Sequence, residues 1–455
     1  MAFALSFAGA ALLSVPAQRF RIDRAGDDCS AWPAISESAA YAAVYLVALA
    51  LLTLGWRRAI KLEWPLGRVL AVGFAVHAVA MLAPPFLSLD TLCYSAVGRA
   101  MAAFHQSPYA PLRATLPAGD RFLTLLPPGW QFGGSAYWPL FNRLSQLIAL
   151  AAGDHLIVHL RLYQLTGALA MTAVAWLTAA AVGDSKAAAF VLFCPLAIVE
   201  ATVNGHNDNL LALSVALFAF CVARRQQTLG ALSLIAGLLV KASGLLVLGM
   251  DVCYLAFSRV RRFVTAARVL GAGAIFIAAT ITAFIVLRRT FPFLNAFSAL
   301  LGSPADAFEH CTRSFECFPR GALRYVFHQP TAAWIVGLAF RAAGGLWLVY
   351  AALRAAKEQR QLAWAACGLF IYYLFLHGFM ESWYLLSLLP LVPHADERLR
   401  PAMQVYLVSA LVYYAIRLPL NCSLSPALIG LKELSEGLVV LVPVVVTLAR
   451  RRRTA

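Results

Sequence analysis

The chain has 455 residues, of which 61% are hydrophobic and only 13% charged, and its mean hydropathy is +0.75. No water-soluble fold has an interior for so much apolar surface, so this composition excludes a soluble globular protein and predicts a polytopic membrane protein. The formal net charge of +16 does not indicate nucleic-acid binding, because Lys and Arg fall in short clusters between apolar runs, where they orient helices and meet anionic membrane lipids.

The first 158 residues predict three apolar segments and one large loop. Residues 2–15 are apolar but lack the basic start and small-residue cleavage site of a signal peptide, which favours a first span or a retained anchor. Apolar runs at 39–56 and 68–82 predict two spans, and the basic sequence RRAIK after the first of them favours the cytoplasmic side. Residues 84–158 then form an extracytoplasmic loop, which is too long to be a simple connector.

A break in the apolar pattern at 241–244 interrupts the segment between Arg224 and the basic cluster that begins at Arg259. This segment holds only about 30 apolar residues, whereas two full crossings need about 40. We therefore expect a short helical hairpin that turns at membrane depth and carries Lys241 roughly 20 Å in from the cytoplasmic side. Unsatisfied backbone at that depth must line a polar cavity.

The other apolar runs complete an all-α bundle of about 12 to 14 transmembrane helices in a single domain, residues 1–455. Alternating basic clusters place both termini in the cytoplasm and a second large extracytoplasmic loop at about 288–330. Beyond the hairpin, the spans expected after the first loop are 156–182, 187–203, 209–222, 264–287, 332–353, 362–376, 383–392, 403–416 and 438–448.

The stretch from 82 to 109 follows a predicted span and carries an acidic residue soon after a Pro-Pro pair. This order places the carboxylate of Asp90 near the membrane–water interface rather than in hydrocarbon. One interpretation is the mouth of an active site; the other is that Asp90 caps a helix over about 91–104, because Ser-x-Asp is an ordinary helix start. Further candidate residues in the same stretch are Tyr94, Arg99, His105 and Tyr109.

A second group of polar residues lies at span ends and at the predicted break. A charged group at a helix centre costs on the order of 2.5–3.5 kcal/mol, so such residues are functional by default. The group comprises Glu200, His206, Asn207, Asp208 and Lys241. Each has a structural alternative: the glutamate pairs with a neighbouring helix, the turn GHND caps the next span, and the lysine extends to the lipid headgroups.

Nine cysteines are scattered along the chain without the clustering of a metal site. Cys311 and Cys317 lie close together in the second predicted loop, on the oxidising side, where they form either a small-loop disulfide or two free thiols. The chain contains no CxxC, Walker, GxGxxG or HExxH sequence. Nothing therefore supports a zinc, ATP-driven or nucleotide-sugar mechanism, and we expect no cofactor.

Four runs, in their order and topological placement, resemble the bacterial GT-C glycosyltransferases, and among them the polyprenol-phosphate-mannose-dependent alpha-mannosyltransferases. The runs are PPFLSLDTLCYSAVGRAMAAFHQSPY, NGHNDNLLAL, LGALSLIAGLLVKASGLLVL and ESWYLLSLLPL. The resemblance covers about residues 69–393 and implies that Asp90 is the catalytic residue of the first large loop. The GHND turn matches at 205–208, and the lysine of the hairpin break matches at Lys241.

The chain departs from the family pattern at two places. Where the family has Val-Tyr-Ser-Tyr after the Asp, this chain has Thr-Leu-Cys-Tyr, so only Tyr94 aligns. A later Pro-Tyr-Gly-Pro-Leu-Trp segment of the family is here the sequence YWPLF at 137–141, which leaves the donor sugar and the acceptor open.

The resemblance implies an inverting transfer of a hexose, with mannose favoured, from a polyprenyl-phosphate sugar donor to an extracytoplasmic lipid-linked or glycan acceptor. A lipid-phosphate sugar already carries its leaving group, so the site needs only a base, Asp90, and cations facing the phosphate, for which Lys241, Arg99 and His206 are candidates. The expected location is the inner (plasma) membrane of a bacterium, with the site on the extracytoplasmic face. The alternatives are a transporter or flippase of a lipid-linked or small polar solute and a non-catalytic membrane scaffold.

Overall fold

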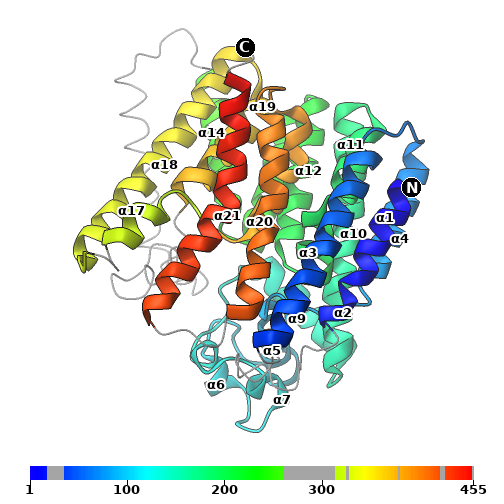
Figure 1. The fold of residues 1–455 in the computed structure, drawn as a ribbon, viewed down its shortest axis with the longest axis vertical. Coiled ribbons are helices and arrows are strands. Elements are labelled where there is room, and N and C mark those ends of the chain that lie inside the picture. Colours follow the sequence, from blue (N-terminus) through cyan, green and yellow to red (C-terminus); the bar gives the residue numbers. More distant parts are fainter. Residues whose placement is uncertain (18–34, 260–312, 324–326, 378–379, 421–425, 453–455) are drawn as a thin grey trace.

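The computed structural model describes residues 1–17, 35–259, 313–323, 327–377, 380–420 and 426–452. Within those ranges every regular element is a helix, which confirms the predicted all-α class. Figure 1 shows the long helices running side by side along one direction, with the short helices α6 (Leu112–Thr115) and α7 (Arg121–Thr124) of the first large loop gathered at one end of the bundle. The chain is thus a polytopic helical membrane protein with a compact loop at one end.

The first 259 residues provide the helices that carry most of the predicted site. Helix α5 (Asp90–Ala103) follows the Pro-Pro pair, and α13 (Gln227–Val240) and α14 (Gly244–Arg259) form the predicted hairpin. The other described helices of this part are α1 (Ala2–Leu12), α2 (Ser14–Ala17), α3 (Ile35–Ala59), α4 (Leu66–Ala80), α8 (Pro128–Gln131), α9 (Pro139–Ala152), α10 (Leu156–Val182), α11 (Ser185–Leu192), the π-helix η2 (Ala197–Val203) and α12 (Asp208–Ala223).

The C-terminal part packs its long helices against the first part and adds several short turns. The described elements are α17 (Cys317–Gly321), α18 (Pro330–Glu358), α19 (Gln361–Ile371), the π-helix η5 (Tyr372–Leu376), the 3-10 helices η6 (Ser382–Leu386) and η7 (Leu389–His394), α20 (Arg400–Leu420) and α21 (Pro426–Arg452). In Figure 1, α20 and α21 stand between the N-terminal helices and α18.

Three described helices are long and apolar enough to cross a membrane: residues 39–59 of α3, α10 and α18. The pair α11 and η2 makes a fourth span if its two bent halves count as one. Shorter apolar helices of 10–17 residues account for most of the remaining predicted spans. These lengths support several membrane passes, and the expected total of 12 to 14 stays a prediction.

Two predicted spans differ from the structure because proline interrupts them. The span expected at 187–203 is bent by 62° between α11 and η2, on either side of Pro195. The span expected at 383–392 is wrong: the chain there forms the two short 3-10 helices η6 and η7, with Pro390 near the start of η7 and Pro393 within it. Proline lacks the N–H that an α-helix needs and clashes with the preceding turn. The span expected at 264–287 lies outside the described residues.

The predicted hairpin is present, with its break at Lys241. Helix α13 ends at Val240, Lys241 has an extended backbone, and α14 begins at Gly244. The backbone N–H of Trp138 donates to the carbonyl of Val240 at 3.2 Å. The first large loop is therefore fixed directly to the hairpin break.

Two glycines position the polar turn. A Cβ on Gly167 of α10 would lie 1.7 Å from the carbonyl oxygen of Ala201, so only glycine lets α10 approach η2 this closely. Gly205 has φ +67°, in the left-handed region that favours glycine, and it reverses the chain between η2 and α12. Together they fix where the residues of the GHND turn lie.

The cysteine expectations are partly covered by the described residues. Cys317 takes part in a disulfide, which excludes a free thiol there. Cys311, its predicted partner, lies outside the described residues, so the pairing stays a prediction. Of the cysteines expected in or beside apolar runs, five are free: Cys93, Cys194, Cys221, Cys253 and Cys367.

Candidate active site

Asp90 is the first residue of α5, and its side chain does not cap the helix. The N-cap position is Leu89, and it is the hydroxyl of Ser88 that accepts a hydrogen bond from the Asp90 N–H, at 3.2 Å. The alternative prediction of a capping role for Asp90 is therefore wrong. Because Ser88 supplies the local bond, the carboxylate is free to face the interior of the protein.

Two hydroxyl donors and one imidazole nitrogen surround one oxygen of the Asp90 carboxylate. The hydroxyls of Tyr94 and Tyr137 lie 3.2 and 3.1 Å from Oδ2, and Nδ1 of His206 lies 3.4 Å from the same atom. Oδ1 accepts no hydrogen bond from the residues that the structure describes. The side chain is 15% exposed, so the protein holds one oxygen while the other stays open to a ligand.

The surroundings keep Asp90 ionised. Burial alone would raise the pKa of this carboxyl, but the hydrogen bond and charge of His206, the charge of Lys241 and the Tyr137 hydroxyl outweigh it and lower the pKa to about 2. At neutral pH the open oxygen is therefore a proton acceptor.

His206 lies between two carboxylates. Its Nδ1 faces Asp90, and its Nε2 lies 3.5 Å from Oε2 of Glu200. The imidazole is fully buried and stacks on Trp383, with ring centroids 4.0 Å apart and planes 20° from parallel. Burial lowers the pKa of His206, but the close contact with Asp90 and the negative charges of Asp90, Glu200 and Asp208 raise the pKa above its ordinary value. The surrounding carboxylates thus stabilise the protonated imidazole relative to a free one.

Lys241 and Asp208 form a buried ion pair, with Nζ 2.7 Å from Oδ2. Nζ also lies 4.3 Å from the ring centroid of Tyr384, and the lysine side chain is only 11% exposed, so it does not extend to the lipid headgroups. Helix α12 begins at Asp208, and Asn207 occupies its N-cap position. The side chain of Asn207 makes no capping hydrogen bond to the helix. The capping alternative for the GHND turn is therefore wrong.

Two further predicted residues, Glu200 and Asn207, lie beside this cluster in the protein interior. Glu200 is fully buried and accepts hydrogen bonds from Ser382 and from Nδ2 of Asn204, the latter at 2.8 Å. The structural alternative for Glu200 is a buried pairing with a neighbouring helix. The hydrogen bond from Ser382 of η6 agrees with this alternative. The Asn207 amide is 1% exposed and has no hydrogen-bond partner within the described part of the chain.

The structure does not bring three of the predicted residues to Asp90. Arg99 lies near the far end of α5, about 13 Å along the helix axis from Asp90, where it forms ion pairs with Asp120 and Asp154. His105 is exposed in the loop with φ +52°, and Tyr109 is half-buried in the same loop. These residues shape the first large loop rather than the cluster around Asp90.

The model of one protein family matches residues 2–257, more than half of the chain: alpha-(1->6)-mannopyranosyltransferase, N-terminal domain. The chain belongs to this family. The matched N-terminal domain contains Asp90, the GHND turn and Lys241. Comparisons with curated proteins and with solved structures find no match. The protein is therefore a membrane glycosyltransferase of a mannosyltransferase family.

Three residues of the candidate site were not predicted individually. Tyr137 donates to Asp90, Trp383 stacks on His206, and Ser382 holds Glu200. Ser382 and Trp383 lie in the run ESWYLLSLLPL, which carries the family resemblance, and Tyr137 lies in YWPLF, where the chain departs from the family pattern. The signal was therefore present in the motifs, but no single residue in them stood out by charge.

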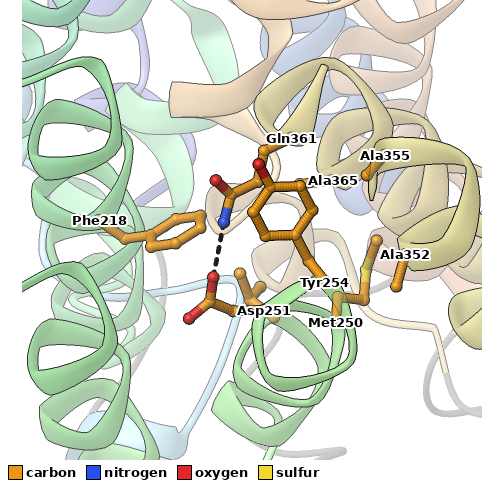
Figure 2. Close-up of a pocket in the computed structure, with 9 residues that line it drawn as sticks. Phe218, Met250, Asp251, Tyr254, Ala352, Ala355, Gln361 and Ala365 are labelled. Atoms are coloured by element: carbon orange, nitrogen blue, oxygen red, sulfur yellow. Dashed lines mark hydrogen bonds between the residues drawn. The ribbon is translucent and has the colours of Figure 1, made fainter. Parts of the chain in front are cut away.

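A pocket elsewhere in the mannosyltransferase contains a buried carboxylate. Figure 2 shows it between α12, α14, α18 and α19, where Nε2 of Gln361 donates to Oδ1 of Asp251 at 2.6 Å. None of the predicted site residues lines this pocket. Among the residues that the structure describes, no cluster of three or more His, Cys, Asp or Glu is arranged to hold a metal ion.

Proposed function

We propose that this protein transfers a hexose, with mannose favoured, from a polyprenyl-phosphate sugar donor to an extracytoplasmic lipid-linked or glycan acceptor, with Asp90 as the general base. The observation that carries this proposal is the asymmetric Asp90 carboxylate. Oδ2 is held by Tyr94, Tyr137 and His206, and Oδ1 is open. A fixed, ionised carboxylate with one free oxygen is suited to accept the proton of an acceptor hydroxyl.

The proposed reaction is a single displacement. The acceptor hydroxyl gives its proton to Oδ1 of Asp90 as its oxygen forms a bond to the anomeric carbon of the donor sugar. The bond between that carbon and the phosphate oxygen breaks, and the electron pair leaves with the polyprenyl phosphate. One displacement without a covalent enzyme intermediate inverts the anomeric configuration.

Lys241 is the cation proposed to stabilise the departing phosphate. It lies beside Asp90 and is 11% exposed, which leaves its ammonium within reach of a ligand. His206, the other candidate beside Asp90, is fully buried and has no surface with which to touch the phosphate. Arg99 is not assigned to this role, because Asp120 and Asp154 already engage its guanidinium at the far end of α5.

Purified protein in detergent or nanodiscs is expected to transfer radiolabelled mannose from synthetic polyprenyl-phosphate mannose to an oligomannoside acceptor. The new linkage, determined by NMR, is expected to have the anomeric configuration opposite to that of the donor. GDP-mannose serves as the matched control donor, because the chain contains no nucleotide-binding sequence. Transfer from GDP-mannose but not from the lipid donor would contradict the proposal.

We place the site on the extracytoplasmic face of a bacterial inner membrane. A cysteine introduced at Ala118, exposed in the first large loop, is expected to react with a membrane-impermeant maleimide in intact cells. A cysteine at Gln359, exposed after α18, is expected to react only after the membrane is permeabilised. Ser135 is unsuitable as a probe position because it is buried and its hydroxyl bonds to Asn142. Labelling of Ala118→Cys from the cytoplasmic side only would invert this topology.

A further inference from the structure

A chain of buried polar contacts begins at Asp90 and continues away from the open oxygen. His206 contacts Asp90 through Nδ1 at 3.4 Å and Glu200 through Nε2 at 3.5 Å. An imidazole that faces a carboxylate at both nitrogens donates from both only when it is protonated. Stacking on Trp383 fixes the plane of the ring, so the position of the imidazole depends on both carboxylates and this one indole.

Glu200 is itself held in place at both carboxylate oxygens. Ser382 donates to Oε1, and the amide of Asn204 donates to Oε2. The side chain is 0% exposed, so it has no surface with which to touch a donor or an acceptor. Whatever Glu200 contributes to the reaction must therefore pass through His206.

The contacts continue from Ser382 into the C-terminal part of the chain, outside the family match. The hydroxyl of Tyr413 lies 3.4 Å from that of Ser382 and donates to Oε2 of Glu381 at 3.1 Å. Arg313 forms an ion pair with Glu381, and its guanidinium stacks 3.4 Å from the ring centroid of Tyr413. Arg313 also pairs with Glu436 at 3.0 Å, so a cluster of buried ion pairs fixes the far end of the chain of contacts.

We propose that Glu200 is a positioning residue of this site, which holds His206 in its protonated form against Asp90 and so keeps one Asp90 oxygen free for the acceptor. The inference rests on the proposed function. It assigns a role to the fully buried carboxylate of the cluster, which the displacement itself does not use. It also gives a role to Ser382 and Trp383, which lie outside the family match and contact Glu200 and His206 within it.

The test is the pH profile of kcat/KM for Glu200→Gln. Glutamine keeps the shape of the side chain, and its oxygen can still accept from Asn204, but it removes one of the charges facing His206. The remaining charged groups near the imidazole are Asp90 of α5 and Asp208 of α12, the latter paired with Lys241 of the hairpin break. Because opposite charges stabilise the protonated ring, the pH at which kcat/KM changes through His206 is expected to move down by about one unit or more.

At neutral pH, Glu200→Gln is also expected to lower kcat by about tenfold with little change in KM, because Glu200 does not touch the substrate. Ser382→Ala is the milder companion variant, because it loosens one of the bonds that hold Glu200, and it should shift the profile in the same direction by a smaller amount. If Glu200→Gln does not fold, Ser382→Ala decides the question. Glu316→Gln is the matched control, since Glu316 is equally buried but pairs with Arg320.

The outcomes separate this inference from the proposed function. A wild-type protein that transfers no sugar from the lipid donor overturns the proposed function and this inference with it. An active wild type, with profiles for Glu200→Gln and Ser382→Ala that superimpose on that of wild type after scaling, overturns the positioning role alone. A downward shift in these two variants, absent from Glu316→Gln, supports it.

Discussion

Asp90→Asn is expected to lower the rate of sugar transfer by about 10²- to 10⁴-fold, the range that general base catalysis contributes. The asparagine oxygen still accepts from Tyr94 and Tyr137, so the geometry of the site persists while the proton acceptor is lost. The measurement is the initial rate of transfer from polyprenyl-phosphate mannose, with the melting temperature determined on the same samples.

The same variant has a limited cost in stability. His206 and Lys241 outweigh the effect of burial and lower the pKa of Asp90 from 3.8 to about 2, which corresponds to about 2 kcal/mol of folding free energy. Because the pKa is lower in the folded protein, this contribution is present above about pH 4 and is lost as the pH falls towards 2. At pH 7 the variant is therefore expected to be less stable than wild type by this amount and still folded.

Asp154→Asn is the matched control for the loss of a carboxylate. Asp154 is 83% exposed and pairs with Arg99, away from Asp90, so its replacement is expected to leave both rate and stability nearly unchanged. Wild-type turnover by Asp90→Asn would contradict the assigned base. The search would then move to Asp208, because its Oδ1 accepts no hydrogen bond from the described residues, whereas both oxygens of Glu200 are already engaged.

Lys241→Met is expected to destabilise the protein by about 3–5 kcal/mol, because it leaves the buried carboxylate of Asp208 without its partner. It should also raise the KM for the lipid donor, because it removes a cation proposed to face the phosphate. Both effects are measurable, the first by thermal or denaturant unfolding and the second by donor titration.

The double variant Lys241→Met/Asp208→Asn separates the two effects. It removes the unpaired charge, so stability is expected to recover most of the loss while the KM for the donor stays high. Lys186→Met is the control for the loss of a lysine. Lys186 forms an exposed ion pair with Glu63, and such a pair contributes less than about 1 kcal/mol to stability. A loss of stability in Lys241→Met no larger than that in Lys186→Met would refute the importance of the buried pair.

Much of the candidate site was predictable because ionisable residues are rare in an apolar chain. Asp90, His206, Asp208 and Lys241 come from three separate stretches, and the structure brings all four together. The helical class and the break at Lys241 follow from the same sparse polar pattern. Charge in a hydrophobic sequence thus indicated which segments had to converge.

The rest was not predictable for two physical reasons. Tyr137 and Trp383 are aromatic residues in a chain where such residues are common, so nothing local marked them as partners of Asp90 and His206. Arg99 is close to Asp90 in sequence, but helix α5 carries it out of the site. The two irregular spans show in turn that hydropathy alone does not reveal where proline stops an α-helix.

The π-helical geometry of η2 makes the length of this segment as important as its composition. The N–H of Asn204 donates to the carbonyl of Val199, five residues back rather than four, so the turn accommodates one residue more than an α-helix does. Deleting one residue between 197 and 203 would let the segment close as an α-helix and rotate the GHND turn by about 100° relative to α11. Chains that descend from a common ancestor and retain this site are therefore expected to accept substitutions here far more readily than insertions or deletions.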